Sequence, residues 1–160
     1  MFNFFKSKDN SLEFYAPVSG TLLNISEIND PVFSSKMLGD GYGVEPSTGA
    51  IYAPVYGTVT AVFPTKHAIG IQTKSGDDVL VHIGIDTVEL AGEPFDIFVE
   101  VGDKVSPKKK LVQVDLDTLE KLNKPKTIIV VYTNRPTVDT FDSLNKREVI
   151  TSEKLGELIK

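Results

Sequence analysis

The fold of this chain is indicated by a repeat: Tyr15-Ala16-Pro17-Val18-Ser19-Gly20-Thr21-Leu22 returns 37 residues later as Tyr52-Ala53-Pro54-Val55-Tyr56-Gly57-Thr58-Val59. In each copy a proline stands at the start of an extended segment, where its missing N–H is tolerated, and a glycine then leads into apolar and β-branched residues. This pattern is typical of strands. Two copies are too few for a solenoid, so the repeat predicts two equivalent units packed into one pseudo-symmetric domain.

The rest of the sequence also favours short strands, at residues 79–85, 98–105, 111–114 and 127–132. Turns rich in Gly, Pro, Asn and Asp separate them, as expected for an antiparallel sandwich or barrel. Residues 115–123 are predicted to form a short surface helix, because their leucines recur at helical spacing, Asp115 can cap the start and Pro125 follows the end. The segment from Arg147 onward is compatible with a helix or with a last strand.

Composition restricts the class of protein. A chain of 160 residues, 41% hydrophobic and 24% charged, has the size of one globular domain. A formal net charge of −5, without a stripe of Lys and Arg interleaved with aromatic residues, argues against nucleic acid as a partner. The absence of cysteine excludes disulfides and thiolate metal sites. With no signal peptide and no apolar run long enough to span a bilayer, the protein is expected in the cytoplasm, as a monomer.

Residues 1–12 are expected to form a flexible N-terminal tail, and residues 13–160 a single domain. The tail begins Met1-Phe2-Asn3-Phe4-Phe5-Lys6-Ser7-Lys8. This aromatic and basic run is compatible with weak contact with a membrane surface or with a solvated end.

Chemistry is expected at His67 and His82, the two histidines of the sequence. Histidine titrates near neutral pH, so it can serve as nucleophile, proton carrier or metal ligand. Alternation along the strand at 79–85 predicts one core-facing stripe, made of Val79, Val81, Ile83 and Ile85. His82 therefore points away from this core, and a hairpin closed at residues 75–78 would bring its strand beside the one that follows His67.

Six motifs occur in a characteristic order: Tyr15-Ala16-Pro17-Val18-Ser19-Gly20, Asp30-Pro31-Val32-Phe33, Gly39-Asp40-Gly41, Ala53-Pro54-Val55-Tyr56-Gly57-Thr58, Thr65-Lys66-His67-Ala68 and Val81-His82-Ile83-Gly84-Ile85-Asp86-Thr87-Val88. Over residues 14–135 this order resembles the glucose-class enzyme IIA family of the bacterial phosphoenolpyruvate:sugar phosphotransferase system. The resemblance implies an all-β, antiparallel barrel-sandwich hybrid with internal duplication and one or two short surface helices. It also implies a phosphotransferase component that acts in sugar uptake through a phosphohistidine and needs no cofactor.

The resemblance implies a role for three residues. His82 matches the histidine that is phosphorylated, His67 the partner that stabilises the phosphoryl group and assists its transfer, and Thr65 the threonine that orients this partner. The implied donor is the histidine phosphocarrier protein. The implied acceptor is a cysteine on the IIB domain of a glucose-type sugar permease, and regulatory binding to other enzymes or transporters is compatible with the same interpretation.

An exposed apolar surface that receives protein partners is implied around the histidines. Its apolar positions are Val32, Phe33, Met37, Leu38, Phe63, Ile69 and Leu80, and its rim carboxylates are Asp30 and Asp86. Contiguous exposed apolar patches usually mark interaction sites. From the sequence alone, Met37, Leu38 and Ile69 are equally compatible with ordinary core positions.

A hydrolase is the alternative class of function. The residues His82-Ile83-Gly84-Ile85-Asp86 also match the His-x-Gly-x-Asp ligand motif of lysostaphin-like zinc endopeptidases, and a histidine with a carboxylate is a sound zinc pair. Those enzymes need a further His-x-His pair, and no histidine follows position 82. The phosphocarrier interpretation requires no metal, although His67 and His82 could bind zinc adventitiously.

Overall fold

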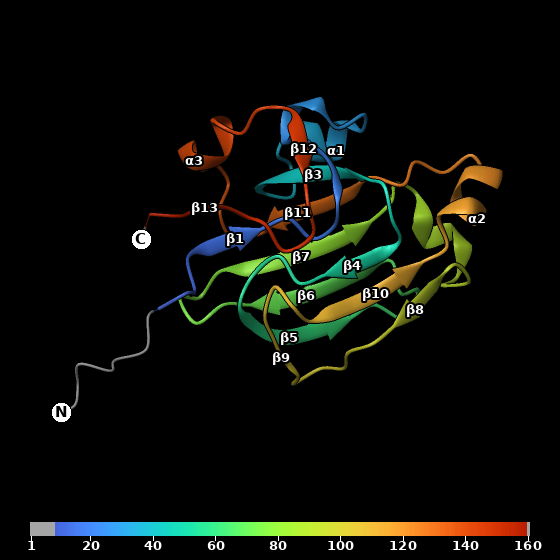
Figure 1. Ribbon diagram of the computed structural model, residues 1–160, viewed down its shortest axis with the longest axis horizontal. Coiled ribbons are helices and arrows are strands. Elements are labelled where there is room, and N and C mark those ends of the chain that lie inside the picture. The colour runs from blue at the N-terminus through green and yellow to red at the C-terminus, as the bar shows by residue number, and fades with distance from the viewer. Residues whose placement is uncertain (1–8, 160) are drawn as a thin grey trace.

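The computed structural model of the protein describes residues 9–159, which form antiparallel sheets joined by short turns and helices (Figure 1). The strands are β1 (Glu13–Tyr15), β2 (Gly20–Asn24), β3 (Asp40–Pro46), β4 (Ala50–Tyr52), β5 (Gly57–Val62), β6 (Ala68–Gln72), β7 (Asp78–Ile83), β8 (Phe95–Ile97), β9 (Lys104–Val105), β10 (Lys110–Val114), β11 (Ile128–Tyr132), β12 (Arg147–Val149) and β13 (Lys154–Glu157). The α-helices are α1 (Pro31–Ser34), α2 (Leu116–Lys121) and α3 (Asp139–Asp142), and the 3₁₀ helices are η2 (Ile25–Glu27) and η3 (Thr87–Leu90).

Eight strands form the largest sheet, in the order β12-β2-β3-β11-β7-β6-β5-β9. A three-stranded sheet has the order β4-β10-β8, and β1 pairs with β13. In Figure 1 the three-stranded sheet lies in front of the strands β5, β6 and β7. The large sheet keeps two edges, at β12 and β9, so it packs as one layer of a sandwich and does not close into a barrel.

The two copies of the sequence repeat form equivalent structures that bind each other. The N–H of Tyr15 donates to the carbonyl of Pro54 at 2.8 Å, and the N–H of Tyr52 donates to the carbonyl of Pro17 at 2.7 Å. The strands around the copies correspond as well: β1 pairs with β13 as β4 pairs with β10, and β2 pairs with β12 as β5 pairs with β9. The predicted internal duplication is confirmed, and the two halves of the large sheet meet between β11 and β7.

The strand β11 separates two apolar clusters, and this arrangement positions the histidines. Alternate side chains of β11 enter the main core, which contains residues of both sheets, or a second cluster on the opposite face. The second cluster consists of Ile25, Ile28, Phe33, Ile85, Ile129 and Val131. Its residues from η2 and α1 cover the outer face of β11. His82 lies opposite Ile129 in the adjacent strand, so it stands at the border of this cluster.

Strand alternation correctly assigned β7 up to its end. Val79, Val81 and Ile83 are buried in the main core, and His82 is half-buried on the opposite face. The assignment of Ile85 to the same stripe is wrong, because the strand ends at Ile83 and Gly84 adopts a φ of +75°. The chain therefore turns, and Ile85 packs into the second cluster instead.

The helices are more numerous than the one or two expected. The predicted surface helix is present as α2, with the side chain of Asp115 accepting a hydrogen bond from the N–H of Thr118. In addition, α1 and α3 each contain four residues. Four residues are too few to show helical periodicity in a sequence. The first of these helices depends on local signals, the cap of Asp30 and proline at the first helical position.

For three further segments, the structure can be compared with what the sequence led us to expect. Residues 98–103 form a turn, in which the N–H of Glu100 donates to the carboxylate of Asp103, and only β9 remains of the strand predicted at 98–105. The ambiguous C-terminal segment forms β12 and β13. Of the expected tail, residues 1–8 lie outside the described residues, while the buried Ser11 and the carbonyl of Leu12, which accepts from the N–H of Leu158, already belong to the folded domain.

Within the part of the chain that the structure describes, no helix has both the length and the apolar character required to cross a bilayer.

Gly41 allows β3 and β11 to approach, and its replacement tests the fold. A Cβ atom at this position would lie 1.8 Å from the carbonyl oxygen of Val130, which cannot retreat without breaking the pairing of the two strands. We expect Gly41→Ala to lower the free energy of unfolding by more than about 3 kcal/mol in chemical denaturation. Gly43→Ala is the matched control, because its Cβ would meet the movable Cδ1 of Ile28 at 3.0 Å. Equal losses in the two variants would contradict this account.

Candidate functional site

The predicted hairpin of β6 and β7 is present, and it also brings the two imidazoles together. A turn at residues 73–77 closes the hairpin, and its register sets Ala68 opposite His82. His67 directly precedes β6, and its carbonyl accepts from the N–H of Ile83 at 2.7 Å. The imidazole centroids lie 5.1 Å apart with the ring planes at 78°. The pair therefore forms one site.

A hydrogen bond to the backbone determines which nitrogen of His82 is available. Its Nδ1 lies 2.8 Å from the carbonyl oxygen of Gly84. A carbonyl can only accept, so Nδ1 carries the proton and Nε2 carries the lone pair. Among the described residues, Nε2 has no hydrogen-bond partner. Because this atom is not buried, it is accessible to solvent.

The turn that presents this carbonyl requires glycine. Gly84 has a positive φ, and a Cβ atom there would lie 2.4 Å from Cγ2 of Thr87 and 2.9 Å from the carbonyl oxygen of Pro125. Thr87 is fully buried, and its hydroxyl donates to the carbonyl of Ile83 at 2.5 Å. The conformation of the turn is thus fixed from both ends, and with it the ring of His82.

His67 is oriented from its other side. The hydroxyl of Thr65 lies 2.6 Å from Nδ1 of His67, a position from which it can orient this ring. The tight turn before β6 places them, with Lys66 at a φ of +60° and its N–H donating to the carbonyl of Phe63 at 2.7 Å. Nε2 of His67 is the nitrogen left for contact with a bound group.

The environment keeps both imidazoles neutral. Burial is the main reason that the pKa of His82 falls from 6.5 to about 4, and the nearby His67 lowers it further. The hydrogen bond to Gly84 and the carboxylates of Asp30 and Asp86 oppose this shift without cancelling it. Burial also lowers the pKa of His67. At pH 7 the Nε2 of His82 is therefore unprotonated and able to attack an electrophile.

Two phenylalanines flank the imidazoles and extend them into a row of four rings. The centroid of Phe33 lies 5.0 Å from that of His82, and the centroid of Phe63 lies 5.5 Å from that of His67. Both contacts are edge-to-face. Contacts with these rings contribute to the burial that lowers the pKa values of the imidazoles.

A shallow depression of about 230 Å³ adjoins His82 and contains several predicted partner-binding residues. Its lining consists of Asp30, Val32, Phe33, Leu38, His82, Asp86, Thr87 and Val88. A larger depression of about 630 Å³ lies beside Tyr56 and Lys74, with neither histidine in its lining. The contact between the imidazoles, and not the size of a cavity, therefore locates the site.

The predicted apolar surface is exposed in part. Met37 is 73% exposed, and Val32, Leu38 and Phe63 are each about two-fifths exposed. Phe33 is largely buried beside His82, and Leu80 is half-buried on the same face of β7.

The expectation for Ile69 is wrong. Its side chain is fully buried in the main core. In β6, Ala68 pairs with His82 and Ile69 pairs with Val81, so Ile69 faces the main core as Val81 does.

Sequence reasoning missed the contributions that three residues make to this site. Gly84 supplies the carbonyl, Thr87 holds the turn, and Val88 is about half exposed at the depression. The only signal in the sequence was their place directly after His82, since the bonds that give them a role depend on the turn geometry.

The zinc alternative lacks a ligand set in the described part of the chain. Within residues 9–159 there is no group of three or more His, Cys, Asp or Glu side chains placed to hold a metal ion. The pair of imidazoles alone is short of the three protein ligands that a catalytic zinc site uses.

Comparison with known proteins identifies the family. The family model described as phosphoenolpyruvate-dependent sugar phosphotransferase system, EIIA 1, matches residues 12–138. The glucose-specific EIIA component of the phosphotransferase system (PTS) of Halalkalibacterium halodurans is 41% identical over 143 residues, which cover 89% of this chain and 80% of that protein. The glucose-specific EIIA component of Staphylococcus epidermidis is 38% identical over 150 residues, covering 92% of this chain and 89% of that protein.

A longer relative and a solved structure agree with this result. The glucose-specific EIICBA component of the Streptococcus pneumoniae PTS is 47% identical over 127 residues, which are 79% of this chain and 18% of that protein. The structure of glucose permease IIA from Mycoplasma capricolum superimposes with a TM-score of 0.77 at 38% identity, covering 99% of this chain and 97% of that one. The duplicated sandwich, the histidine pair and these matches lead to one conclusion: the chain belongs to the EIIA 1 family of the phosphoenolpyruvate-dependent sugar phosphotransferase system and is a phosphotransferase component of that system.

Proposed function

We propose that the protein accepts a phosphoryl group on Nε2 of His82 from the histidine phosphocarrier protein and donates it to a cysteine on the IIB domain of a glucose-type permease. The observation that carries this proposal is the bond between Nδ1 of His82 and the carbonyl of Gly84, which leaves a neutral Nε2 at the surface. The ring of His67 stands beside it, with the two imidazole centroids 5.1 Å apart. Family membership supports it, because the system to which the family belongs transfers phosphoryl groups.

The proposed step is an exchange of one phosphorus–nitrogen bond for another. The lone pair on Nε2 of His82 attacks phosphorus in line, a new N–P bond forms, and the N–P bond to the donor histidine breaks with its electron pair returning to that imidazole. Positive charge develops on His82 as the bond forms, and the carbonyl of Gly84 stabilises it through Nδ1–H. Positioning and charge stabilisation are the main contributions that a protein makes to phosphoryl transfer.

The role assigned to His67 is to donate a hydrogen bond to the phosphoryl oxygens. If the hydroxyl of Thr65 donates to Nδ1 of His67, the remaining proton of that imidazole is on Nε2 and can be donated to an oxygen of the group on His82. A threonine that fixes the tautomer of a functional histidine acts indirectly, through the orientation of the ring.

The exposed apolar side chains beside the histidines are assigned to protein docking. Val32, Leu38 and Val88 line the depression at His82, with the carboxylates of Asp30 and Asp86 at the same place. Such a surface fits a partner with an apolar centre and a cationic rim. The Streptococcus relative, named as an EIICBA component, joins a segment like this chain to further components, which supports a IIB domain as the second partner.

The remaining expectations follow the same assignment. The folded domain, which includes Ser11 and Leu12 in addition to the residues expected from the sequence, would act as one IIA domain in the cytoplasm, where the phosphocarrier protein and the IIB domain can both reach His82. Regulatory binding to other enzymes or transporters would use the same apolar surface.

Intact-mass analysis tests the phosphorylated residue. After incubation with enzyme I, the phosphocarrier protein and phosphoenolpyruvate, the protein should gain the mass of one phosphoryl group. His82→Ala should abolish the gain, while Thr65→Val, which leaves the nucleophile in place, should retain it. A gain that survives His82→Ala would refute the assignment.

The second histidine should matter more for transfer than for acceptance. His67→Gln should still be phosphorylated on His82, but single-turnover transfer to the IIB domain should be roughly 100-fold slower, since one donor to the phosphoryl oxygens is displaced. Thr65→Val should cause a smaller loss, and Thr65→Ser, which keeps the hydroxyl, almost none. Transfer at the normal rate by His67→Gln would remove His67 from the mechanism.

The pKa of His82 should be visible in an NMR titration of the imidazole, with a midpoint near pH 4. Because the folded pKa lies below the unfolded value of 6.5, this group contributes full stability above pH 6.5, and the contribution is lost as the pH falls toward 4. In His67→Gln the midpoint should rise but stay below 6.5, because desolvation, the larger cause, remains. A midpoint of 6.5 in the unchanged protein would contradict the buried environment.

A further inference from the structure

Lys36 occupies the turn between α1 and β3, directly before the most exposed part of the apolar surface. Its φ is +63°, a left-handed conformation that glycine adopts easily and lysine does not. The next two residues are Met37, 73% exposed, and Leu38, which lines the depression at His82. The backbone at Lys36 therefore sets where these two apolar side chains lie.

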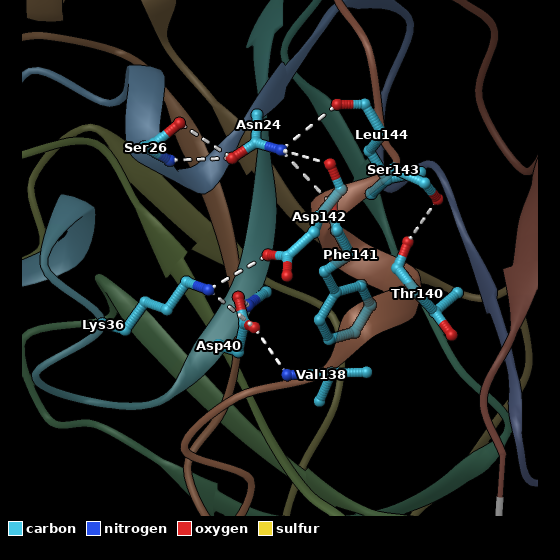
Figure 2. Close-up of polar contacts among 11 residues, drawn as sticks. Asn24, Ser26, Lys36, Asp40, Val138, Thr140, Phe141, Asp142, Ser143 and Leu144 are labelled. Atoms are coloured by element: carbon cyan, nitrogen blue, oxygen red, sulfur yellow. Dashed lines mark hydrogen bonds and ion pairs between the residues drawn. The ribbon is translucent and has the colours of Figure 1, made fainter.

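The side chain of Lys36 bridges two carboxylates from separate elements (Figure 2). Its Nζ lies 3.2 Å from Oδ2 of Asp40, at the start of β3, and 3.1 Å from Oδ1 of Asp142, at the end of α3. We call these three residues the Lys36 clamp. Burial alone would lower the pKa of Lys36, but the hydrogen bonds to Asp142 and Asp40 raise it overall, so the ammonium stays charged at pH 7.

The Asp40 end of the clamp is rigid. The side chain of Asp40 is fully buried, with Oδ1 accepting from the N–H of Gly41 at 2.8 Å and Oδ2 accepting from the N–H of Val138 at 2.7 Å. Lys36 is the cation recorded at this carboxylate among the described residues. A buried charge is strongly destabilising without a partner, so the ion pair with Asp40 offsets the unfavourable backbone conformation of Lys36.

The Asp142 end of the clamp is anchored as well. The amide of Asn24 donates to the carbonyls of Phe141 and Leu144, at 3.3 and 3.2 Å, and so ties α3 to the end of β2 (Figure 2). Phe141 is buried against Phe14, with the ring centroids 5.0 Å apart. The lysine thus connects the turn of residues 35–39 to two fixed points, one on β3 and one on α3.

We propose that Lys36 is a positioning residue for partner docking: through Asp40 and Asp142 it holds Leu38 beside the proposed phosphorylation site and fixes the exposed Met37 next to it in the chain, without touching the phosphoryl group itself. This inference rests on the proposed function, because the surface that it positions is the proposed docking surface for the phosphocarrier protein. The apolar pair then meets its partner already in place, and less conformational entropy is lost on binding.

The test separates docking from chemistry. In Lys36→Met, which keeps the length of the side chain without the charge, the dissociation constant for the phosphocarrier protein and the KM for it as phosphoryl donor should both rise about tenfold. The kcat at saturating donor should change by less than about twofold, since the histidines are untouched. Amide hydrogen exchange at residues 34–39 should accelerate, and Lys36→Arg should restore binding.

Two further variants keep the result interpretable. Asp142→Asn removes one ion pair from an exposed carboxylate, leaves Asp40 paired, and should weaken docking about threefold. It carries the test if Lys36→Met fails to fold. Lys126→Met is the control. It breaks a comparable ion pair with Glu120, which lies on the surface helix α2, and should leave docking unchanged.

The outcomes distinguish this inference from the proposed function. Unchanged dissociation constants in Lys36→Met and Asp142→Asn would overturn the inference, as would a fall in kcat with no change in KM. If the unchanged protein gains no phosphoryl mass, the proposed function fails, whatever the variants do.

Discussion

The pairing of β6 with β7 is the constraint on which the site depends. Its register sets Ala68 opposite His82. His67, the residue before Ala68, therefore lies beside the imidazole of His82. The same strand alternation sends Val81 and Ile83 into the core, so the histidine cannot turn inward without exchanging apolar side chains for a polar one. The chemistry of the site is thus fixed by the burial of residues that take no part in it.

The end of β7 adds the second constraint. The chain must leave the strand at Gly84, because this residue has a positive φ and no room for a Cβ. Its carbonyl then occupies Nδ1 of His82 and leaves Nε2 free. Burial lowers the pKa of His82 and keeps that nitrogen unprotonated at neutral pH. The backbone turn and the buried setting together leave an unprotonated Nε2 on His82 at neutral pH, which is the property that the proposed phosphoryl transfer needs.

Much of this architecture could be predicted from the sequence, because it follows local patterns. The repeat predicted the duplication, alternation predicted the outward face of His82, and the turn at 75–78 predicted the hairpin. The burial of Ile69 could not be predicted, since it depends on where β6 begins. The four-residue helices have no periodicity, and the ion pair of Lys36 with Asp142 joins residues 106 positions apart. Such long-range contacts follow from the assembled fold.

The most direct test of the account is the identity of the nitrogen that bears phosphorus. Nitrogen–phosphorus couplings in ¹⁵N-labelled, phosphorylated protein assign the phosphoryl group to one nitrogen of one imidazole. Because Nδ1 of His82 donates to the carbonyl of Gly84 at 2.8 Å, the account predicts coupling to Nε2 of His82 with Nδ1 still protonated. Coupling to Nδ1 of His82, or to either nitrogen of His67, would contradict it.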